Sequence, residues 1–169
     1  QKKAFLYGDW DIFDGQYFTE FVRDIHVIQP FVIPSRWRRY TAMDYGLDML
    51  AALLIGIDRN GNVWVLRELC ESGLTLTEAA KRVSLLADGQ NAEFAVCSPD
   101  LWNRRQDSGK SGFEIMQAIR GMPPMRAADD RRIAGWRILR EYLSAKGGHP
   151  FIKICEECTN LISSLPALL

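Results

Sequence analysis

The stretch that decides the fold spans residues 40–69 and reads YTAMDYGLDMLAALLIGIDRNGNVWVLREL. Three runs rich in β-branched, aromatic and other apolar side chains, residues 40–45, 49–58 and 63–69, are separated by short turns. Asn60-Gly61 between the last two runs is a strong hairpin signal, and Gly46 marks the first turn. The pattern therefore predicts three consecutive antiparallel strands.

Downstream of these strands the apolar spacing changes from alternation to a repeat of about 3.6 residues, which is typical of a helix. The pattern predicts a helix from about Glu78 to Ala87, capped by Thr75 or Thr77. Residues 92–97 then form a short apolar run of the buried-strand type. Three strands, a helix and a strand that pairs parallel to the first are the topology of a ribonuclease H-like sheet, with a right-handed crossover.

The rest of the chain alternates in the same way. It predicts helices at 112–120 and 129–145, strands at 125–128 and 151–154, and a last helix from Glu156. The expected fold class is therefore α/β, a mixed sheet of three antiparallel strands with parallel additions, flanked by helices. We interpret residues 1–39 as a linker segment and residues 40–169 as the domain. Gln1 in place of methionine and an apolar helical pattern up to Leu169 indicate a piece of a longer protein, truncated at its C-terminus.

The composition is that of an ordinary globular domain. Hydrophobic residues make up 47% of the 169 residues, which is enough for one core without disulfides. No apolar span reaches 18 residues and no signal peptide is visible, so we expect no membrane partner. The Cys155-x-x-Cys158 pair has no second pair of metal ligands at matching spacing, which favours buried thiols over zinc or redox chemistry.

Net charge gives no hint of a nucleic-acid partner, because 21 Lys and Arg balance 21 Asp and Glu. Arginines are nevertheless clustered, and their planar guanidinium groups suit phosphate. The residues that we expect to contact DNA are Arg38, Arg39, Arg104, Arg105, Lys110 and Arg131. The alternative is that these clusters are solvated faces whose stems pack against the surface.

Asp44 is an ionisable residue in a strand that otherwise needs apolar side chains. Desolvating its carboxylate without a partner would be costly. A divalent cation would offset that cost, because Mg²⁺ and Mn²⁺ prefer hard oxygen ligands. The alternative is an exposed acid at the end of the strand, before a glycine turn.

Three further acids are candidate ligands. Asp100 follows the 92–97 run, and open α/β sheets place their sites at the carboxyl ends of strands, so we expect Asp100 near Asp44; the alternative is a cap. Glu68, near the end of the third strand, is either a ligand or an acid paired with a basic residue. Asp130 starts a predicted helix, where capping competes with metal binding.

Stretches along nearly the whole chain resemble, in the same order, the nuclease domain of tailed-bacteriophage terminase large subunits. They include Gly8-Asp9-Trp10-Asp11, Trp37-Arg38-Arg39-Tyr40, Met43-Asp44-Tyr45-Gly46, Val65-Leu66-Arg67-Glu68, Ser98-Pro99-Asp100-Leu101-Trp102-Asn103, Asp130-Arg131-Arg132-Ile133-Ala134-Gly135-Trp136 and Cys158-Thr159-Asn160-Leu161-Ile162. The resemblance implies that Asp44 is the catalytic aspartate of the first strand and that an ATPase domain precedes Gln1. Many members have a second metal-binding acid directly before a proline, where this chain has Ser98, so Asp100 would replace it. The third acid would lie beyond Leu169.

The resemblance also implies an activity. The domain would cut concatemeric double-stranded DNA by two-metal phosphodiester hydrolysis, using Mg²⁺ or Mn²⁺. Asp44, Asp100 and Glu68 are the expected catalytic residues, with Asp130 as an additional metal ligand. The expected partners are DNA, a portal protein and the small terminase subunit, in the cytoplasm of the bacterial host. The alternatives are a Holliday-junction resolvase-like nuclease and a non-catalytic module that docks on DNA or a portal protein.

Overall fold

The computed structural model describes residues 15–46, 48–87, 90–106, 109–145 and 149–168. Its elements are, in chain order, α2 (Arg23–His26), β1 (Val27–Ile28), β2 (Arg38–Tyr45), β3 (Met49–Ile57), β4 (Val63–Ser72), α3 (Leu76–Leu86), β5 (Ala95–Cys97), the 3₁₀ turn η1 (Pro99–Trp102), α4 (Gly112–Gln117), β6 (Met125–Ala127), α5 (Arg132–Leu143), β7 (Ile152–Cys155) and α6 (Thr159–Ala167). Seven strands form one mixed sheet in the order β1-β7-β4-β3-β2-β5-β6. The predicted α/β class is confirmed.

The three antiparallel strands form as predicted. β2 pairs with β3 from Arg38↔Ile57 to Tyr45↔Leu50, and β3 pairs with β4 through a register shift between Leu54 and Ile55. These three strands form the centre of the sheet.

The turn between β3 and β4 explains why this hairpin closes where it does. The Asp58 carboxylate accepts hydrogen bonds from the backbone N–H groups of Asn60 and Asn62, at 2.8 and 3.0 Å, and from the Trp64 indole at 3.1 Å. Burial works against the charged form, but these bonds together with the Asn62 amide outweigh it and lower the pKa of Asp58. Gly61 adopts a φ of +83°, which glycine tolerates without strain.

The parallel additions lie on both sides of these strands. β5 pairs with β2 from Thr41↔Ala95 to Met43↔Cys97, as expected, and β6 pairs with β5. On the other side β7 pairs with β4, and β1 pairs with β7. The short strand β1 comes from the segment before residue 40, which also places Phe18 and Phe21 in the interior.

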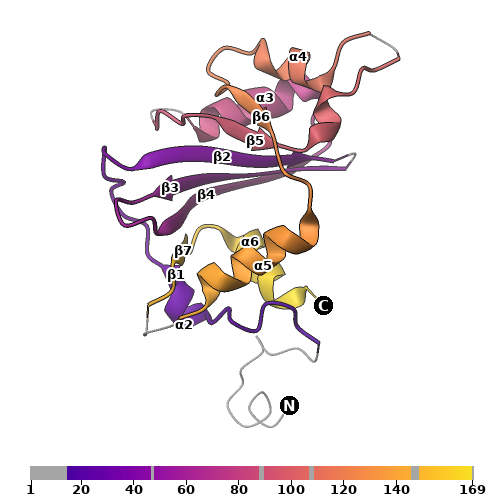
Figure 1. The fold of residues 1–169 in the computed structure, drawn as a ribbon. Helices are drawn as coiled ribbons and strands as arrows, with labels where there is room; N and C mark the ends of the chain where they lie inside the picture. The colour runs from indigo at the N-terminus through magenta and orange to yellow at the C-terminus, as the bar shows by residue number, and fades with distance from the viewer. Residues whose placement is uncertain (1–14, 47, 88–89, 107–108, 146–148, 169) are drawn as a thin grey trace.

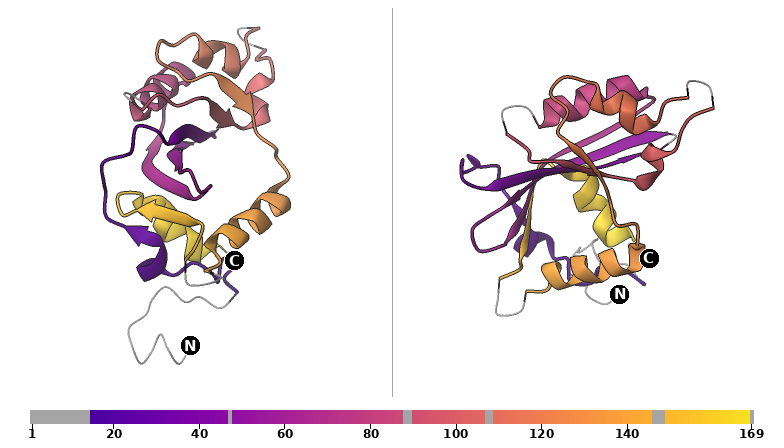
Figure 2. Two further views of the ribbon diagram at one scale, coloured as in Figure 1. Left: turned by 60° about the vertical axis from the view of Figure 1, so that its left-hand side comes forward. Right: turned by 45° about the horizontal axis from the view of Figure 1, so that its top comes forward.

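Helices lie on both faces of the sheet. Figure 1 shows α3 and α4 on one side and α5 and α6 on the other, and both views in Figure 2 keep this arrangement. The first core contains Met43, Leu50, Ala52, Ala80, Val83, Cys97 and Met116. The second contains Phe18, Val65, Leu143, Ile154, Cys158 and Ile162. Among the described helices, none is long and apolar enough to cross a membrane.

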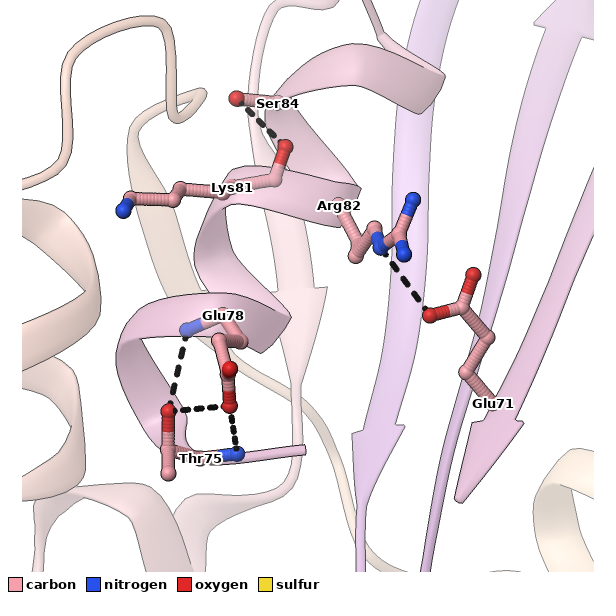
Figure 3. Close-up of polar contacts among 6 residues, drawn as sticks. All are labelled: Glu71, Thr75, Glu78, Lys81, Arg82 and Ser84. Carbon is pink, nitrogen blue, oxygen red and sulfur yellow. Dashed lines mark hydrogen bonds and ion pairs between the residues drawn. The ribbon is translucent and has the colours of Figure 1, made fainter. Parts of the chain in front are cut away.

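The N-terminus of α3 shows how the sequence starts this helix. Thr75, one of the two predicted caps, accepts a hydrogen bond from the Glu78 N–H at 3.3 Å, and the Glu78 carboxylate accepts from the Thr75 N–H at 2.9 Å (Figure 3). This reciprocal capping box satisfies two donors that the helix leaves unpaired. Arg82 then pairs with Glu71 of β4 at 3.0 Å, so the helix is tied to the sheet (Figure 3).

Two predicted helix starts were wrong by about three residues. α5 begins at Arg132 rather than Asp129, because the Asp129 carboxylate binds the Arg131 guanidinium and does not cap the helix. α6 begins at Thr159 rather than Glu156. The interpretation of Cys155 and Cys158 as buried thiols is confirmed, and burial raises the pKa of Cys158 to about 12.

Candidate active site

The carboxyl ends of β2 and β5 lie side by side because the two strands pair in parallel up to Met43↔Cys97. A pocket of about 290 Å³ opens at these ends. Its lining residues are Asp44, Tyr45, Gly46, Leu76, Ser98, Asp100, Leu101, Asn103, Arg105 and Gly112. The two acids that the sequence singles out on these strands, Asp44 and Asp100, therefore share one pocket.

Asp44 is held by a well-anchored strand end. Met43 before it is buried in the first core, so alternation places Asp44 on the opposite face of the sheet, where it is exposed. The Tyr45 hydroxyl donates to the Leu74 carbonyl at 2.7 Å, and the Gly46 N–H donates to the Met49 carbonyl at 2.9 Å. The carboxylate is therefore open to solvent while its backbone is fixed.

Asp100 is presented by the 3₁₀ turn η1. The Leu101 N–H donates to the Ser98 carbonyl at 3.2 Å and the Asn103 N–H to the Asp100 carbonyl at 3.0 Å, which closes the turn. Leu101 is 7% exposed and anchors the turn in the first core. A Cβ atom on Gly112 would lie 2.8 Å from Leu101 Cδ2, so glycine at this position lets α4 pack directly on the turn.

The loop that follows this turn carries three basic side chains. Arg104 forms a β-bridge with Ser111, and the Arg105 N–H donates to the Lys110 carbonyl at 3.1 Å. Ser111 caps α4 in a second capping box, whose hydrogen bonds lower the pKa of Glu114. Arg104, Arg105 and Lys110 are exposed, and Arg105 also lines the pocket. Arg105 thus lies beside the acidic pair, and two further predicted DNA contacts, Arg104 and Lys110, are exposed on the same loop.

Glu68 lies outside the pocket lining. Its carboxylate accepts hydrogen bonds from the backbone N–H groups of Asn160 and Leu161, at 2.8 and 2.7 Å, and from the Asn160 side chain at 3.2 Å. It therefore caps α6, a role that neither interpretation of the strand pattern anticipated. Both carboxylate oxygens are engaged, which satisfies orphan donors at the helix start.

The remaining predicted residues do not line the pocket. Asp130 is exposed just before α5. The Arg131 guanidinium beside Asp129 lowers the pKa of that carboxyl to about 2. Arg38 forms a bidentate pair with Glu93, with both N–O distances at 2.9 Å. Arg39 is 7% exposed.

Because the Arg39 side chain is buried, it is not placed to contact DNA as predicted. Its two terminal nitrogens donate to the backbone carbonyls of Gln90 and Pro34, at 2.9 and 2.8 Å. These bonds tie the segment before β2 to the segment before β5. The guanidinium is therefore a structural link, as expected for a buried charged group with hydrogen-bond partners.

The donor chemistry of the pocket fits a hard divalent cation, but only in part. Carboxylate oxygens such as those of Asp44 and Asp100 are the ligands that Mg²⁺ and Mn²⁺ prefer. Within the described ranges no group of three or more His, Cys, Asp or Glu is arranged to hold a metal. The pocket as described thus supplies two acids, one from a strand and one from a turn.

Similar proteins are found by comparing structures and not by comparing sequences. No protein-family model matches the sequence, and no curated protein sequence does. The P22 large terminase nuclease domain superimposes with a TM-score of 0.69 at 17% identity, covering 89% of this chain and 77% of that one. This chain has the fold of a phage large terminase nuclease domain. The expected ribonuclease H-like terminase fold is thereby confirmed.

Two more solved structures match this chain in fold. The large terminase of a thermophilic bacteriophage matches with a TM-score of 0.71 at 18% identity, covering 90% of this chain but 36% of that protein. The large terminase nuclease domain of bacteriophage SPP1, solved with bound Mn, matches with a TM-score of 0.56 at 16% identity, covering 89% of this chain and 78% of that one. This chain therefore spans about a third of the longer terminase that it matches.

The uncharged residues that shape the pocket were not predicted from the sequence. Ser98 and Asn103 contribute to the wall, and Leu101 with Gly112 positions the Asp100 turn. The proline at Pro99 was a usable signal for the turn, since proline favours the first position of a helical turn. Nothing in the local sequence around Gly112 distinguishes a close packing contact from an ordinary helix start.

Proposed function

We propose that this chain is the metal-dependent endonuclease part of a phage DNA-packaging terminase, which hydrolyses phosphodiester bonds of double-stranded DNA. The observation that carries the proposal is the pocket at the ends of β2 and β5, which Asp44 and Asp100 line together in a chain with the terminase nuclease fold. Strand ends that bring two acids together are a recurrent position for catalytic sites in α/β sheets.

Each charged residue of the pocket has a part in this reaction. Asp44 and Asp100 hold Mg²⁺ or Mn²⁺, which when bound activates water and stabilises the leaving oxygen. Arg105, with Arg104 and Lys110 on the same loop, binds the backbone phosphates and aligns the strand without reading its sequence. The well-anchored end of β2 keeps the Asp44 carboxylate in position throughout.

The count of acids predicts weak metal binding. Two carboxylates neutralise half of the charge on two dications, so further negative charge must come from the substrate phosphate or from another acid. In this proposal the third acid follows Leu169. We therefore expect cleavage by residues 1–169 to require Mn²⁺ in the millimolar range.

The larger context is part of the same proposal. An ATPase domain before this chain, a portal protein, a small terminase subunit and concatemeric DNA in the cytoplasm of the bacterial host form the setting in which such a domain acts. The SPP1 relative, solved with Mn, supports the choice of cation. A non-catalytic module that docks on DNA would keep the basic loop but would have no use for the acidic pair.

A plasmid-nicking assay tests the proposal. Supercoiled plasmid is incubated with the wild type, Asp44→Asn and a control, Asp24→Asn, which replaces an exposed acid on α2. We expect Mn²⁺-dependent nicking by the wild type and the control, and none by Asp44→Asn. Equal nicking by all three proteins would exclude Asp44 as a catalytic residue, and plasmid binding without nicking in any of them would favour the docking module.

A further inference from the structure

Two aromatic rings and two guanidinium groups form a continuous ladder across β2, β5 and β6. The Tyr40 and Phe94 rings lie 4.7 Å apart, centroid to centroid. The Arg126 guanidinium carbon lies 4.0 Å over the Phe94 ring, and that of Arg38 lies 5.4 Å over the Tyr40 ring. The order along the ladder is therefore cation, ring, ring, cation.

This ladder lies on a part of the sheet that belongs to neither core. Met43 and Cys97 point into the first core, so Tyr40, Phe94 and Arg126 occupy the opposite face by alternation and register. The second core, on that opposite face, draws its strand residues from β1, β3, β4 and β7, as far as the described residues show. α6 packs on β4 and α2 packs on β7, whereas on the other half of the sheet Tyr40 and Phe94 are partly exposed and Arg126 is exposed.

Charge on the ladder is net positive and is concentrated at one end. The Arg38 hydrogen bonds lower the pKa of Glu93, so this carboxylate is charged and neutralises Arg38. Arg126 is exposed and has no ion pair within 4 Å among the residues that the structure describes, although it lies near enough to Glu93 to help lower the pKa of that carboxyl. One guanidinium stacked on a ring is thus available to an anion.

The ladder and the acidic pocket occupy opposite ends of the same two strands. Tyr40 and Asp44 are both on β2 and share one face, so they are separated by about 13 Å at the usual rise of a strand. Phe94 precedes β5, and Ser98 and Asp100 follow it. This distance corresponds to a few nucleotides of an unpaired DNA strand, whose phosphates can lie farther apart than the about 3.4 Å per strand of a stacked duplex.

We propose that the Arg126–Phe94–Tyr40–Arg38 ladder binds unpaired bases of the DNA strand a few nucleotides from the bond that is cut. This inference rests on the proposed nuclease function and adds a single-stranded element to its substrate. Bases stack on aromatic rings and on guanidinium planes with little regard to sequence, and the neighbouring phosphates are attracted by Arg126. A fully paired duplex buries its base faces and offers the ladder phosphates alone.

The test measures strand binding without cleavage. Fluorescence anisotropy with labelled dT12 and with a labelled 12-base-pair duplex is recorded in EDTA, so the result does not depend on metal or on the nuclease site. The variants are Phe94→Leu, which removes a ring but keeps apolar volume, and Arg126→Gln on the exposed surface. The control, Phe151→Leu, removes another half-exposed ring that lies just before β7 and outside the ladder.

We expect Phe94→Leu and Arg126→Gln each to weaken dT12 binding by about tenfold, as for the loss of one stacked base, and to affect duplex binding less. Phe151→Leu should bind dT12 like the wild type. The proposal is overturned if Arg126→Gln, which leaves the core intact, binds dT12 normally, or if duplex binding falls by as much as single-strand binding. Failure of plasmid nicking in Mn²⁺ would instead reject the nuclease proposal, and dT12 binding separates the two results.

Discussion

Asp44 on β2 and Glu68 on β4 are acids on the two strands that flank β3 in one sheet, yet their surroundings differ completely. Glu68 faces the start of α6 and accepts two backbone N–H groups and a side-chain amide. Asp44 is exposed at the end of its strand, and it lines a pocket with Asp100. The comparison teaches that the neighbouring layer, and not the strand pattern, decides whether an acid on a strand stabilises the fold or is available for chemistry.

The largest expected effect is the loss of nuclease activity when one of the two pocket acids is replaced. Asp44→Asn or Asp100→Asn removes one of two carboxylates from the pocket, so we expect Mn²⁺-dependent plasmid nicking to fall at least about 100-fold, because metal-assisted hydrolysis depends on the charge of its ligands. The melting temperature should stay near the wild-type value, because both side chains are exposed. Loss of nicking together with loss of folding would contradict the assignment.

The next effect concerns the support of the pocket. Gly112→Ala places a Cβ atom 2.8 Å from Leu101 Cδ2, and we expect a loss of about 1–3 kcal/mol in the free energy of unfolding, with reduced nicking as the Asp100 turn shifts. Gly135→Ala in α5 is the matched control, because nothing lies within 4 Å of the added atom. That variant should gain about 0.5–1 kcal/mol. Urea denaturation measures both, and equal behaviour of the two variants would exclude the packing contact.

Glu68 gives the opposite outcome to Asp44. Glu68→Ala leaves two helix N–H groups of α6 without an acceptor, so we expect the free energy of unfolding to fall by about 1–2 kcal/mol while nicking by the folded protein is unchanged. Glu157→Ala, an exposed acid just before α6, should have little effect on either. A stable Glu68→Ala protein that no longer nicks plasmid would return Glu68 to the catalytic site.

The smallest effect is electrostatic and local to the start of α5. Hydrogen bonds from Arg131 lower the pKa of Asp129 from 3.8 to about 2, so any stability from this exposed pair is complete above about pH 4 and is lost as the pH falls to 2. Carboxyl chemical shifts followed by NMR should show Asp129 titrating near 2. In Arg131→Gln the midpoint should return towards 3.8, and an unchanged midpoint would mean that another group lowers it.

Local sequence signals were sufficient for the centre of the fold. Strands β2, β3 and β4 were predicted within a few residues because alternation and the Asn60-Gly61 turn act over short distances. The parallel pairing of β5 with β2 followed from the helix between them, and this pairing was enough to predict that Asp44 and Asp100 share a pocket.

What the sequence did not predict depends on contacts between distant segments. β1 has two residues in the segment interpreted as a linker, and it is a strand only because β7 lies beside it in parallel. The cap that Glu68 forms needs a helix that begins 91 positions later in the chain. Arg39 looks like its neighbour Arg38 in the sequence, and only packing shows that one is buried and the other exposed.

The two acids of the pocket differ in how their backbone is held. Asp44 belongs to a strand with a hydrogen-bonded neighbour on each side, β3 and β5, whereas Asp100 belongs to a four-residue turn held by the packing of Leu101 and of Trp102, whose ring stacks on Phe113. Amide hydrogen exchange should therefore be slow around Asp44 and fast around Asp100, because local opening is easiest where few contacts hold the chain. The site thus has a rigid side and a side that opens more easily, and under the proposed nuclease function we expect the second side to change shape when DNA binds.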